Sequence, residues 1–555
     1  MRFNIADHRI EYHGKRETHR FNENRVIEFN HRHESALRNY ELELVEADVS
    51  VLSERINPQS NLGSLRNRQL RESVVLSAAL AAVAVGLNGR GSLKRYSDQE
   101  ITNNLTNDLK RANDRTAAQV MAEVLQTTTE RLPIGEEVLI ESTITEGVRV
   151  KPGYEAGGNP TIAVGALFGK PQHRARYGTS MPVSVTLLSM GNDVIDGTTK
   201  SVKGLHSSLT ALFLTESHVK RHLPDVYVQR WMSAGAFEEF NPREMSLVES
   251  AEIIARSYGQ SSVEDLTAFF LDRKRHYPAM DLLNEAGVTT PFDTDGDLFP
   301  AIVLGHEGVD FPGGRRLNAM VGEIGGSAEW AVGVLPLVWR GGQAIGMLTS
   351  QTALSRKDRD PDKQWNERFN FTENEFIMIQ DARFEHKPYF SIRDILEDPF
   401  AGGISAFGAI TDNYYLPFMQ GVATDEGADR ISVDVLVVNS MGLMECWRLN
   451  LRARQSLADS RRLLSSPKEE LSGLAGTDLE KAVARCLEDD KGRRRFRIFF
   501  NNEYYPAMIP MRDRFVMLHR VIDDLIERGA LSEHDRHIVE VAERTAADWF
   551  IAPGD

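Results

Sequence analysis

The chain has 555 residues, of which 41% are hydrophobic and 26% charged, a profile typical of a soluble globular protein with about two to four domains. The formal net charge is −15 and no long Lys/Arg block is present, which argues against general nucleic-acid binding because phosphate neutralisation supplies most of that affinity. The two cysteines, Cys446 and Cys486, exclude a disulfide framework and a four-cysteine zinc site, and they fit a reducing cytoplasm.

The beginning of the chain is polar. The first 33 residues are rich in Arg, His, Asn and Glu and have no apolar core, so we do not expect a secretory signal peptide. We interpret residues 1–68 as an N-terminal extension. The Ala/Val/Leu run from Arg71 to Leu87 then predicts a helix that stops at Asn88-Gly89. Its apolar part is shorter than the roughly 20 residues that span a bilayer, so it indicates a buried helix and no membrane contact.

The middle of the chain alternates helical and strand patterns. Residues 92–109 are polar and resemble an insertion, and Asp114 to Leu125 is the next predicted helix, with Asp114 at its start. Alternating or short apolar runs predict strands at Val138–Thr145, Val183–Ser189, Ala301–Leu304, Asn318–Ile324 and Val433–Val438. This alternation favours an α/β fold. Beyond residue 454 the pattern is helical, and we interpret residues 455–555 as a helical extension for packing or oligomerisation.

The sharpest chemical feature is the run from Asp193 to Thr199, which follows an apolar strand pattern. Carboxylates such as Asp193 and Asp196 are the oxygen ligands that hard divalent cations prefer. Gly197 lets the backbone approach closely, and N–H groups at the start of a following helix can bind an anion. The same cluster could also be an ordinary Asp/Gly/Thr turn.

Other carboxylates lie in comparable positions. Glu141 falls on the predicted strand 138–145, and Glu329 follows a Gly-Gly turn, where Ser327 is a candidate N-cap that places Glu329 in the first turn of a helix. A first-turn glutamate is also the ordinary helix preference. Position alone therefore assigns no function to either residue.

The order of these motifs resembles the class II fructose-1,6-bisphosphatase family, within the lithium-sensitive, metal-dependent sugar and inositol phosphatases. The resemblance runs from about Glu72 to Arg452. It rests on Lys110–Asp114, Leu139–Glu141, Asp193–Thr198, Lys203-Gly204, Asp225–Tyr227, Arg273–His276, Asp295–Asp297 and Gly325–Glu329.

The resemblance implies a layered α/β/α/β/α sandwich of the sugar phosphatase type with a C-terminal helical extension. It divides the chain into an N-terminal extension (1–68), a metal-binding α/β half (69–220), a substrate-binding α/β half (221–454) and the extension 455–555.

The resemblance also implies which residues bind and react. Mg²⁺ or Mn²⁺ would be held by Asp114, Glu141, Asp193, Asp196 and Glu329. The catalytic residues would be Glu141, Asp193 and Thr198, with Glu141 or Thr198 orienting the attacking water. The substrate would contact Asp196, Gly197, Thr198, Tyr227, Arg273, Lys274, Arg275, Asp295, Gly296, Asp297 and Gly326.

The implied reaction is hydrolysis of the 1-phosphate of a sugar bisphosphate, in the first place fructose 1,6-bisphosphate to fructose 6-phosphate, as in gluconeogenesis. The partner would be a small sugar phosphate, with no nucleic acid and no membrane, and we expect a cytoplasmic homo-oligomer.

Two departures from the family pattern leave alternatives open. Thr143 stands where the family has a second acid, and Trp330 stands where it has a glycine after the last ligand. The same chemistry on sedoheptulose bisphosphate or an inositol phosphate is one alternative, and a catalytically weakened protein that binds a sugar phosphate is the other.

Overall fold

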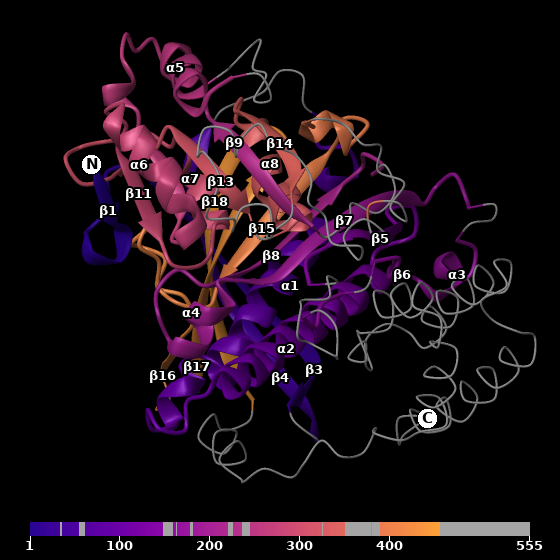
Figure 1. Cartoon of the computed structure of the whole chain (residues 1–555). Helices are drawn as coiled ribbons and strands as arrows, with labels where there is room; N and C mark the ends of the chain where they lie inside the picture. The colour runs from indigo at the N-terminus through magenta and orange to yellow at the C-terminus, as the bar shows by residue number, and fades with distance from the viewer. Residues whose placement is uncertain are drawn as a thin grey trace, which may run out of the picture.

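The structure is a computed structural model. It describes residues 1–454 apart from 34–35, 55–60, 148–158, 163, 178–180, 220–225, 236–244, 325, 350–378, 380–388, 426 and 428. Within these limits the chain is a mixed α/β protein with two large sheets (Figure 1), which confirms the predicted α/β class. The predicted helical extension 455–555 lies outside the described residues.

The larger sheet carries the acidic motif. In the described part it has ten strands, and all neighbours are antiparallel except β5 and β7. In spatial order these are β3 (Glu17–His33), β4 (Ala36–Glu54), β18 (Leu443–Ala453), β17 (Arg430–Asn439), β15 (Gly403–Ala409), β8 (Leu209–Thr215), β7 (Thr186–Asp196), β5 (Val138–Thr145) and β6 (Leu167–Gly169), with β16 (Ala423–Asp425) beside β17.

The smaller sheet carries the predicted substrate segments. Its six described strands are β1 (Arg2–Asn4), β11 (Thr290–Asp293), β10 (Ala268–Leu271), β13 (Ala319–Ile324), β9 (Tyr227–Ser233) and β14 (Gln343–Thr349). The pairs from β1 to β13 are parallel, and β9 is antiparallel to both β13 and β14. A separate antiparallel pair joins β2 (Glu11–Tyr12) to β12 (Val309–Asp310).

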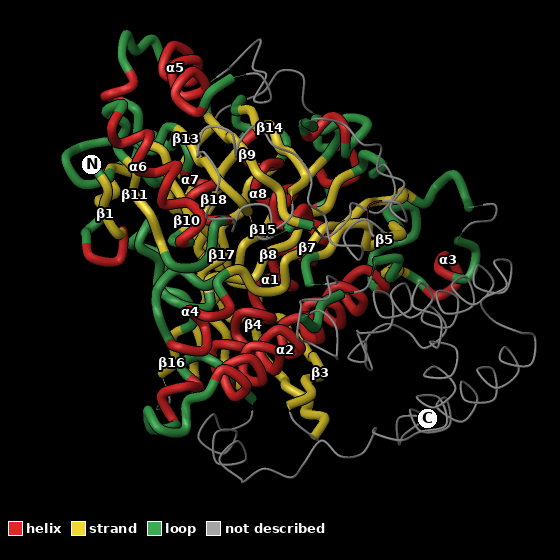
Figure 2. The backbone as a smooth tube through the Cα atoms, in the orientation of Figure 1, coloured by secondary structure: helices red, strands yellow, loops and turns green. Residues whose placement is uncertain are grey.

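Helices cover both sheets. The described helices are α1 (Arg68–Asn88), α2 (Asn103–Glu130), α3 (Pro171–Arg174), α4 (Thr198–Lys203), α5 (Leu247–Ser257), α6 (Tyr277–Glu285), α7 (Leu298–Val303) and α8 (Ser327–Trp339). Helices α1 and α2 lie side by side and pack on the larger sheet (Figure 2). Helix α8 contacts strands of both sheets and packs against α7, while α5 and α6 share a core with the smaller sheet.

Helix α1 confirms the predicted buried helix. The side chain of Asn67 accepts hydrogen bonds from the N–H groups of Gln69 and Leu70 at its start, and Gly89 caps its end. By length and composition α1 is the one described helix that could cross a membrane, but 83% of its apolar window is buried inside the protein. Burial on all sides explains its nearly uniform Ala/Val/Leu composition.

Residues 1–68, interpreted as an N-terminal extension, contribute strands to the larger sheet. Strand β4 pairs with β18 along its length, and the β3–β4 hairpin adds two strands to the larger sheet. Ile27, Leu42 and Leu44 are buried in the same core as α1 and α2. The polar composition of this segment arises because the other face of the hairpin carries charged pairs such as Arg20–Asp48.

Other boundaries also differ from those predicted. Residues 301–303 end helix α7, Leu304 is its C-cap residue, and no strand forms here, because a short, fully buried apolar run fits either structure. Helix α2 begins at Asn103, where the side chain of Thr102 caps it, so Asp114 lies inside the helix and not at its start. The predicted strand 183–189 is observed from Thr186 to Asp196. The strands predicted near 138–145, 318–324 and 433–438 are confirmed.

Candidate functional site

The acidic motif forms the predicted strand, turn and helix. Strand β7 ends at Asp196, and α4 begins at Thr198. Gly197 joins them with a φ of 74°, a left-handed conformation that a residue with a side chain adopts only at a cost. A Cβ atom here would also lie 3.4 Å from the carbonyl oxygen of Ser207. The turn therefore favours glycine, and it joins Asp196 at the end of β7 directly to Thr198 at the start of α4.

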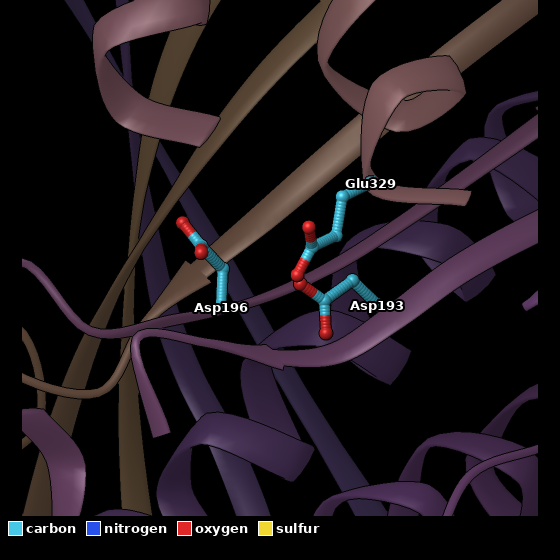
Figure 3. Close-up of side chains that lie close together, drawn as sticks. All are labelled: Asp193, Asp196 and Glu329. Carbon is cyan, nitrogen blue, oxygen red and sulfur yellow. The ribbon is translucent and has the colours of Figure 1, made fainter. Parts of the chain in front are cut away.

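Glu329 joins the two aspartates from another element. It lies in the first turn of α8, and its Oε2 accepts the N–H of Gly326 at 2.8 Å, so Gly326 and not Ser327 is the N-cap residue. One oxygen from each of Asp193, Asp196 and Glu329 lies within 4.8 Å of the others. Figure 3 shows the carboxylates of Asp193 and Glu329 turned toward each other, with that of Asp196 to one side.

The electrostatics of this acidic cluster favour the binding of a cation. The pKa of Asp193 lies well above its usual value; burial is the largest cause, and the charge of Glu146 is the second. Burial and the charge of Asp297 have the same effect on the pKa values of Asp196 and Glu329. Asp193 Oδ2 is buried and has no hydrogen-bond partner among the described residues. Buried carboxylates that repel one another become stable as anions when a divalent cation binds them, so this donor set fits Mg²⁺ or Mn²⁺.

Asp114 lies beside the cluster, as the resemblance implies. Its Oδ1 accepts the hydroxyl of Thr198 at 3.3 Å, and its charge contributes to the raised pKa of Asp193. The side chain comes from the middle of α2, which packs against α4.

Glu141 does not reach the cluster. It pairs with Ser189 in the parallel β5–β7 register, four residues before Asp193 and thus about 13 Å along the strand. Its side chain instead accepts the hydroxyl of Tyr177. The structure therefore corrects the placement of Glu141, both as a ligand and as a residue that orients water.

Glu146, which was not identified from the sequence, lies beside the cluster. Its N–H donates to the carbonyl of Asn192 at 3.1 Å, which sets it beside Asp193 just past the end of β5. Its charge acts on both Asp193 and Glu329. The signal was available in the sequence, because ligands gather at the carboxyl ends of parallel strands and Glu146 follows such an end.

The departure at Thr143 has a structural explanation. The β5–β7 register shifts between Ser142 and Ile144, so Thr143 is the extra residue of a β-bulge. Its buried hydroxyl donates to the carbonyl of Met190 at 3.1 Å. The bulge also shifts which later residues of β5 face the cluster.

The acidic turn 295–297 contacts the cluster directly. The N–H groups of Asp297 and Leu298 donate to the two oxygens of Asp196 at 3.2 and 3.0 Å. Gly296 has a φ of 75°, and a Cβ atom there would lie 3.3 Å from Asp196 Oδ2. Burial raises the pKa of Asp297 to about 6, although Arg230 and Arg273 oppose this effect.

The predicted basic loop lies against this turn. Arg273 donates to the carbonyl of Thr294 and lies 3.5 Å from Asp295 Oδ1. Burial opposes ionisation of Asp295, but Arg273, Lys110 and Lys200 outweigh it and lower its pKa. The Asp295 carboxylate also accepts the N–H of Thr199 at 3.0 Å, which ties the turn to α4.

The remaining predicted substrate residues border the same loop. The guanidinium carbon of Arg275 lies 5.8 Å from the centre of the Tyr227 ring, at the start of β9. Lys274 is exposed between the two arginines. Of the neighbouring motif residues, Gly325 and Asp225 lie outside the described part of the chain.

Three cations near the site were not assigned from the sequence. Lys110 Nζ donates to Thr199 Oγ1 at 2.9 Å, Lys200 forms a buried ion pair with Asp293 at 2.6 Å, and Arg230 lies 3.5 Å from Asp297. Lys110 begins the recognised motif Lys110–Asp114 and Lys200 lies just after Asp193–Thr198, but nothing in the pattern of β9 marks Arg230. These cations place positive charge on the side of α4 that faces the acidic turn.

Comparison with known proteins identifies the same family pattern. A family model described as bacterial fructose-1,6-bisphosphatase, glpX-encoded, matches residues 175–412. A "D-fructose 1,6-bisphosphatase class 2/sedoheptulose 1,7-bisphosphatase" of Synechococcus sp. (strain JA-3-3Ab) is 26% identical over 278 residues, covering 46% of this chain and 73% of that protein. The protein of the same name from Synechococcus sp. (strain JA-2-3B'a(2-13)) has the same identity and coverage.

A relative of that name from Trichodesmium erythraeum (strain IMS101) is 24% identical over 192 residues, covering 31% of this chain and 53% of that protein. The segment matched by the family model contains Asp193, Asp196 and Glu329. It also contains the two predicted substrate loops, 273–276 and 295–297. Asp114 and Glu146 precede it. The comparisons confirm the resemblance that the motif series predicted.

Proposed function

Since the chain is a relative of the class II fructose-1,6-bisphosphatases, we propose that it is a divalent-metal-dependent phosphatase that removes the 1-phosphate from a sugar bisphosphate, most simply fructose 1,6-bisphosphate. One observation carries the proposal. The buried carboxylates of Asp193 and Asp196 converge with the half-buried carboxylate of Glu329, and Asp196 also holds the turn that contacts the basic loop.

The fold we propose is the α/β/α/β/α sandwich of sugar phosphatases. Helices α1 and α2 pack on the larger sheet, α8 contacts both sheets, and α5 and α6 share a core with the smaller sheet. These contacts support five layers, with the acidic cluster between the carboxyl end of β7 and the start of α8.

The metal ligands we propose are Asp193, Asp196 and Glu329, together with Asp114 and Glu146. When bound there, Mg²⁺ or Mn²⁺ would supply Lewis acidity, which makes water a better nucleophile at neutral pH and offsets phosphoryl charge. The mutual repulsion of these carboxylates in the metal-free protein supports this ligand set.

Thr198 is the residue that we propose to orient the attacking water. Its Oγ1 lies 3.3 Å from Asp114 Oδ1 and 3.1 Å from the carbonyl oxygen of Ile195, so its proton is directed to one of these acceptors. A lone pair of the hydroxyl oxygen then remains to accept a hydrogen bond from water. Glu141 is replaced in this role because it lies about 13 Å along the strand from the level of Asp193.

The chain offers two regions of positive charge for the two phosphates. The labile phosphate would lie at Gly197 and Thr198, where Lys110 contributes charge through its contact with Thr199. The second phosphate would contact Arg273, Lys274 and Arg275, with Tyr227 beside them. Asp295, Gly296, Asp297 and Gly326 would border the sugar, where acidic side chains can accept hydrogen bonds from hydroxyl groups.

Sedoheptulose 1,7-bisphosphate is the second candidate substrate, because the relatives carry both activities in their name. The weakened, merely binding protein is less favoured. Thr143 is a bulge residue bound to Met190, and Trp330 is fully buried against Phe390, so both departures serve packing.

We further propose a cytoplasmic homo-oligomer that binds neither nucleic acid nor membrane. The acidic net charge of −15 supports the absence of nucleic-acid binding. The helical pattern of residues 455–555 supports a role in assembly. Light scattering of the full chain and of a variant that ends at residue 454 tests this role, and an equal number of subunits in the two proteins would contradict it.

Phosphate release from a panel of sugar bisphosphates, sugar monophosphates and inositol phosphates tests the proposed activity. We expect turnover of one bisphosphate with Mg²⁺ or Mn²⁺ and none with chelator. The variant Asp193→Asn should fold but release no phosphate. Near-normal hydrolysis by this variant, or no hydrolysis of any bisphosphate by the parent protein, would contradict the proposal.

A further inference from the structure

Arg2, on the first strand of the chain, lies between two aromatic rings. Its guanidinium carbon is 3.9 Å from the centre of the Tyr277 ring and 5.3 Å from that of Phe292. Arg2 Nη1 also lies 3.5 Å from Asp281 Oδ1. The arginine side chain is 29% exposed, so these contacts are partly shielded from water, and a planar guanidinium suits such stacking.

Each ring belongs to a residue close in sequence to one of the two predicted substrate loops, the acidic turn 295–297 and the basic loop 273–276. Phe292 lies on β11, immediately before Asp293 and the acidic turn 295–297. Tyr277 follows the basic loop 273–276 and begins α6. Arg2 therefore contacts Phe292, three positions before the acidic turn, and Tyr277, directly after the basic loop. Strand β1 itself pairs with β11 in parallel, with Asn4 opposite Phe292.

Hydrogen bonds carry this connection to Arg273. The Tyr277 hydroxyl donates to Asp272 Oδ1 at 2.6 Å, and the N–H of Asp272 donates to the carbonyl of Asp293 at 2.7 Å. Arg273 Nη1 then donates to the carbonyl of Asp272 at 3.2 Å and also to that of Thr294. The aromatic contacts of Arg2 and the position of the Arg273 guanidinium thus belong to one connected network.

We propose that Arg2 is a positioning residue for substrate binding, which clamps the basic loop against the acidic turn and so holds Arg273 in place for an anionic group. This inference rests on the proposed function for the identity of that group, a sugar phosphate. Arg2 acts through Tyr277 and Phe292 and does not belong to the acidic cluster. It also precedes the segment 175–412 that the family model matches.

The first test compares steady-state kinetics of three variants at saturating Mn²⁺. Arg2→Ala should raise KM about fivefold with kcat nearly unchanged, a loss in the range of one cation–π contact. Arg2→Lys should recover part of this loss, because an ammonium keeps the charge but not the planar stack. Arg9→Ala is the matched control, since Arg9 is an exposed arginine of the same segment and should leave KM unchanged.

Tyr277→Phe separates the ring from its hydroxyl. It keeps the surface on which Arg2 stacks but removes the hydrogen bond to Asp272, so KM should also rise. Because both residues act along one path, the Arg2→Ala/Tyr277→Phe double variant should lose less than the product of the two single losses. Fully multiplicative effects would show that the residues act independently and would overturn the proposed path.

Amide hydrogen exchange provides a readout that needs no substrate. In Arg2→Ala, the amides of Asp272 and Thr294 should exchange faster, while those of β8 in the other sheet keep their rates. If the parent protein hydrolyses no sugar phosphate but this exchange pattern appears, the proposed function fails and the clamp stands. If Arg2→Ala matches Arg9→Ala in both KM and exchange, or lowers kcat alone, the clamp is wrong.

Discussion

The carboxylate of Asp196 accepts the backbone N–H of Asp297 at 3.2 Å, and this hydrogen bond joins the two sheets at the site. Asp196 ends β7 of the larger sheet, and Asp297 follows β11 of the smaller one. The second carboxylate oxygen accepts the N–H of Leu298 at 3.0 Å. Any change at Asp196 therefore affects a proposed metal ligand and the substrate-side turn together.

Metal binding should stabilise the folded chain, and chelation should make its stability depend on pH. Asp193, Asp196 and Glu329 have raised pKa values when folded, so the metal-free protein binds more protons than the unfolded chain above the ordinary carboxyl range. Its stability should therefore fall as pH rises through those raised values. Thermal unfolding measured with chelator and with Mn²⁺ tests this, and Mn²⁺ at about 100 times its dissociation constant should contribute about 2.7 kcal/mol.

The Asp193→Asn variant is the control for that experiment. It removes one of the repelling charges, so the metal-free variant should lose less stability on alkalinisation than the metal-free parent protein. It should also gain less from Mn²⁺. Equal Mn²⁺ stabilisation of the two proteins would show that the cation binds elsewhere.

The variants Glu146→Gln and Glu141→Gln distinguish the two candidate glutamates. Glu146→Gln should weaken metal-dependent turnover by about 100-fold or more, since losing a unit charge close to a divalent cation costs several kcal/mol. Glu141→Gln should keep most activity, because its side chain binds Tyr177. The measurement is phosphate release as a function of Mn²⁺ concentration. The reverse order of effects would restore the original assignment of Glu141.

Gly197→Ala should abolish most turnover through local geometry. A left-handed φ costs an alanine about 1 to 2 kcal/mol, and Gly259→Ala carries the same strain, with a φ of 73° and open space around a Cβ. Urea unfolding should show similar losses of stability for both variants. Only Gly197→Ala should lose phosphate release. Comparable activity of the two variants would mean that the turn at Gly197 has no direct role.

His306 should make the metal-loaded protein acid-sensitive. The pKa of His306 is lowered to about 4; burial is the larger cause, and the charge of Arg340 is the second. Its Nδ1 accepts the N–H of Gly308 at 2.9 Å, which requires that nitrogen to be unprotonated. The unfolded chain therefore takes up the proton first, and stability should fall as pH drops from 6.5 toward 4, by about 3 kcal/mol in total.

His306→Asn keeps an acceptor near the same position but cannot titrate. The difference in unfolding free energy between this variant and the parent protein, measured with Mn²⁺ from pH 7 to pH 4.5, isolates the histidine. This difference should shift in favour of the variant as pH falls. A difference that is constant with pH would contradict the lowered pKa.

The sequence predicted the elements whose pattern is local. The α1 helix follows from its composition and its Gly89 stop, and the turn after Asp196 follows from Gly197. Strand β3 and strand β4 were missed because their apolar residues, such as Ile27 and Leu42, are buried only when distant elements cover them. Pairing across hundreds of residues leaves no local periodicity to detect.

The site shows the same division. Asp193, Asp196 and Glu329 were identified from their motifs, and the structure brings them together. Glu146 was missed because the motif match on β5 was made at Leu139–Glu141, whereas the residue beside Asp193 follows the end of that strand. Arg2 had no recognisable motif, since its contacts depend on where β1 joins the smaller sheet.

The pairing of β4 with β18 also constrains how the chain can be made. Asn450 lies opposite Glu46 in this ladder, 404 positions away in sequence. During synthesis at about 5 to 20 residues per second, the free edge of β4 must wait at least tens of seconds for its partner strand to emerge. An open strand edge of this length is a template for pairing with other chains. The yield of active protein should therefore depend on synthesis rate and on chaperones that cover this edge, independently of the stability of the finished fold.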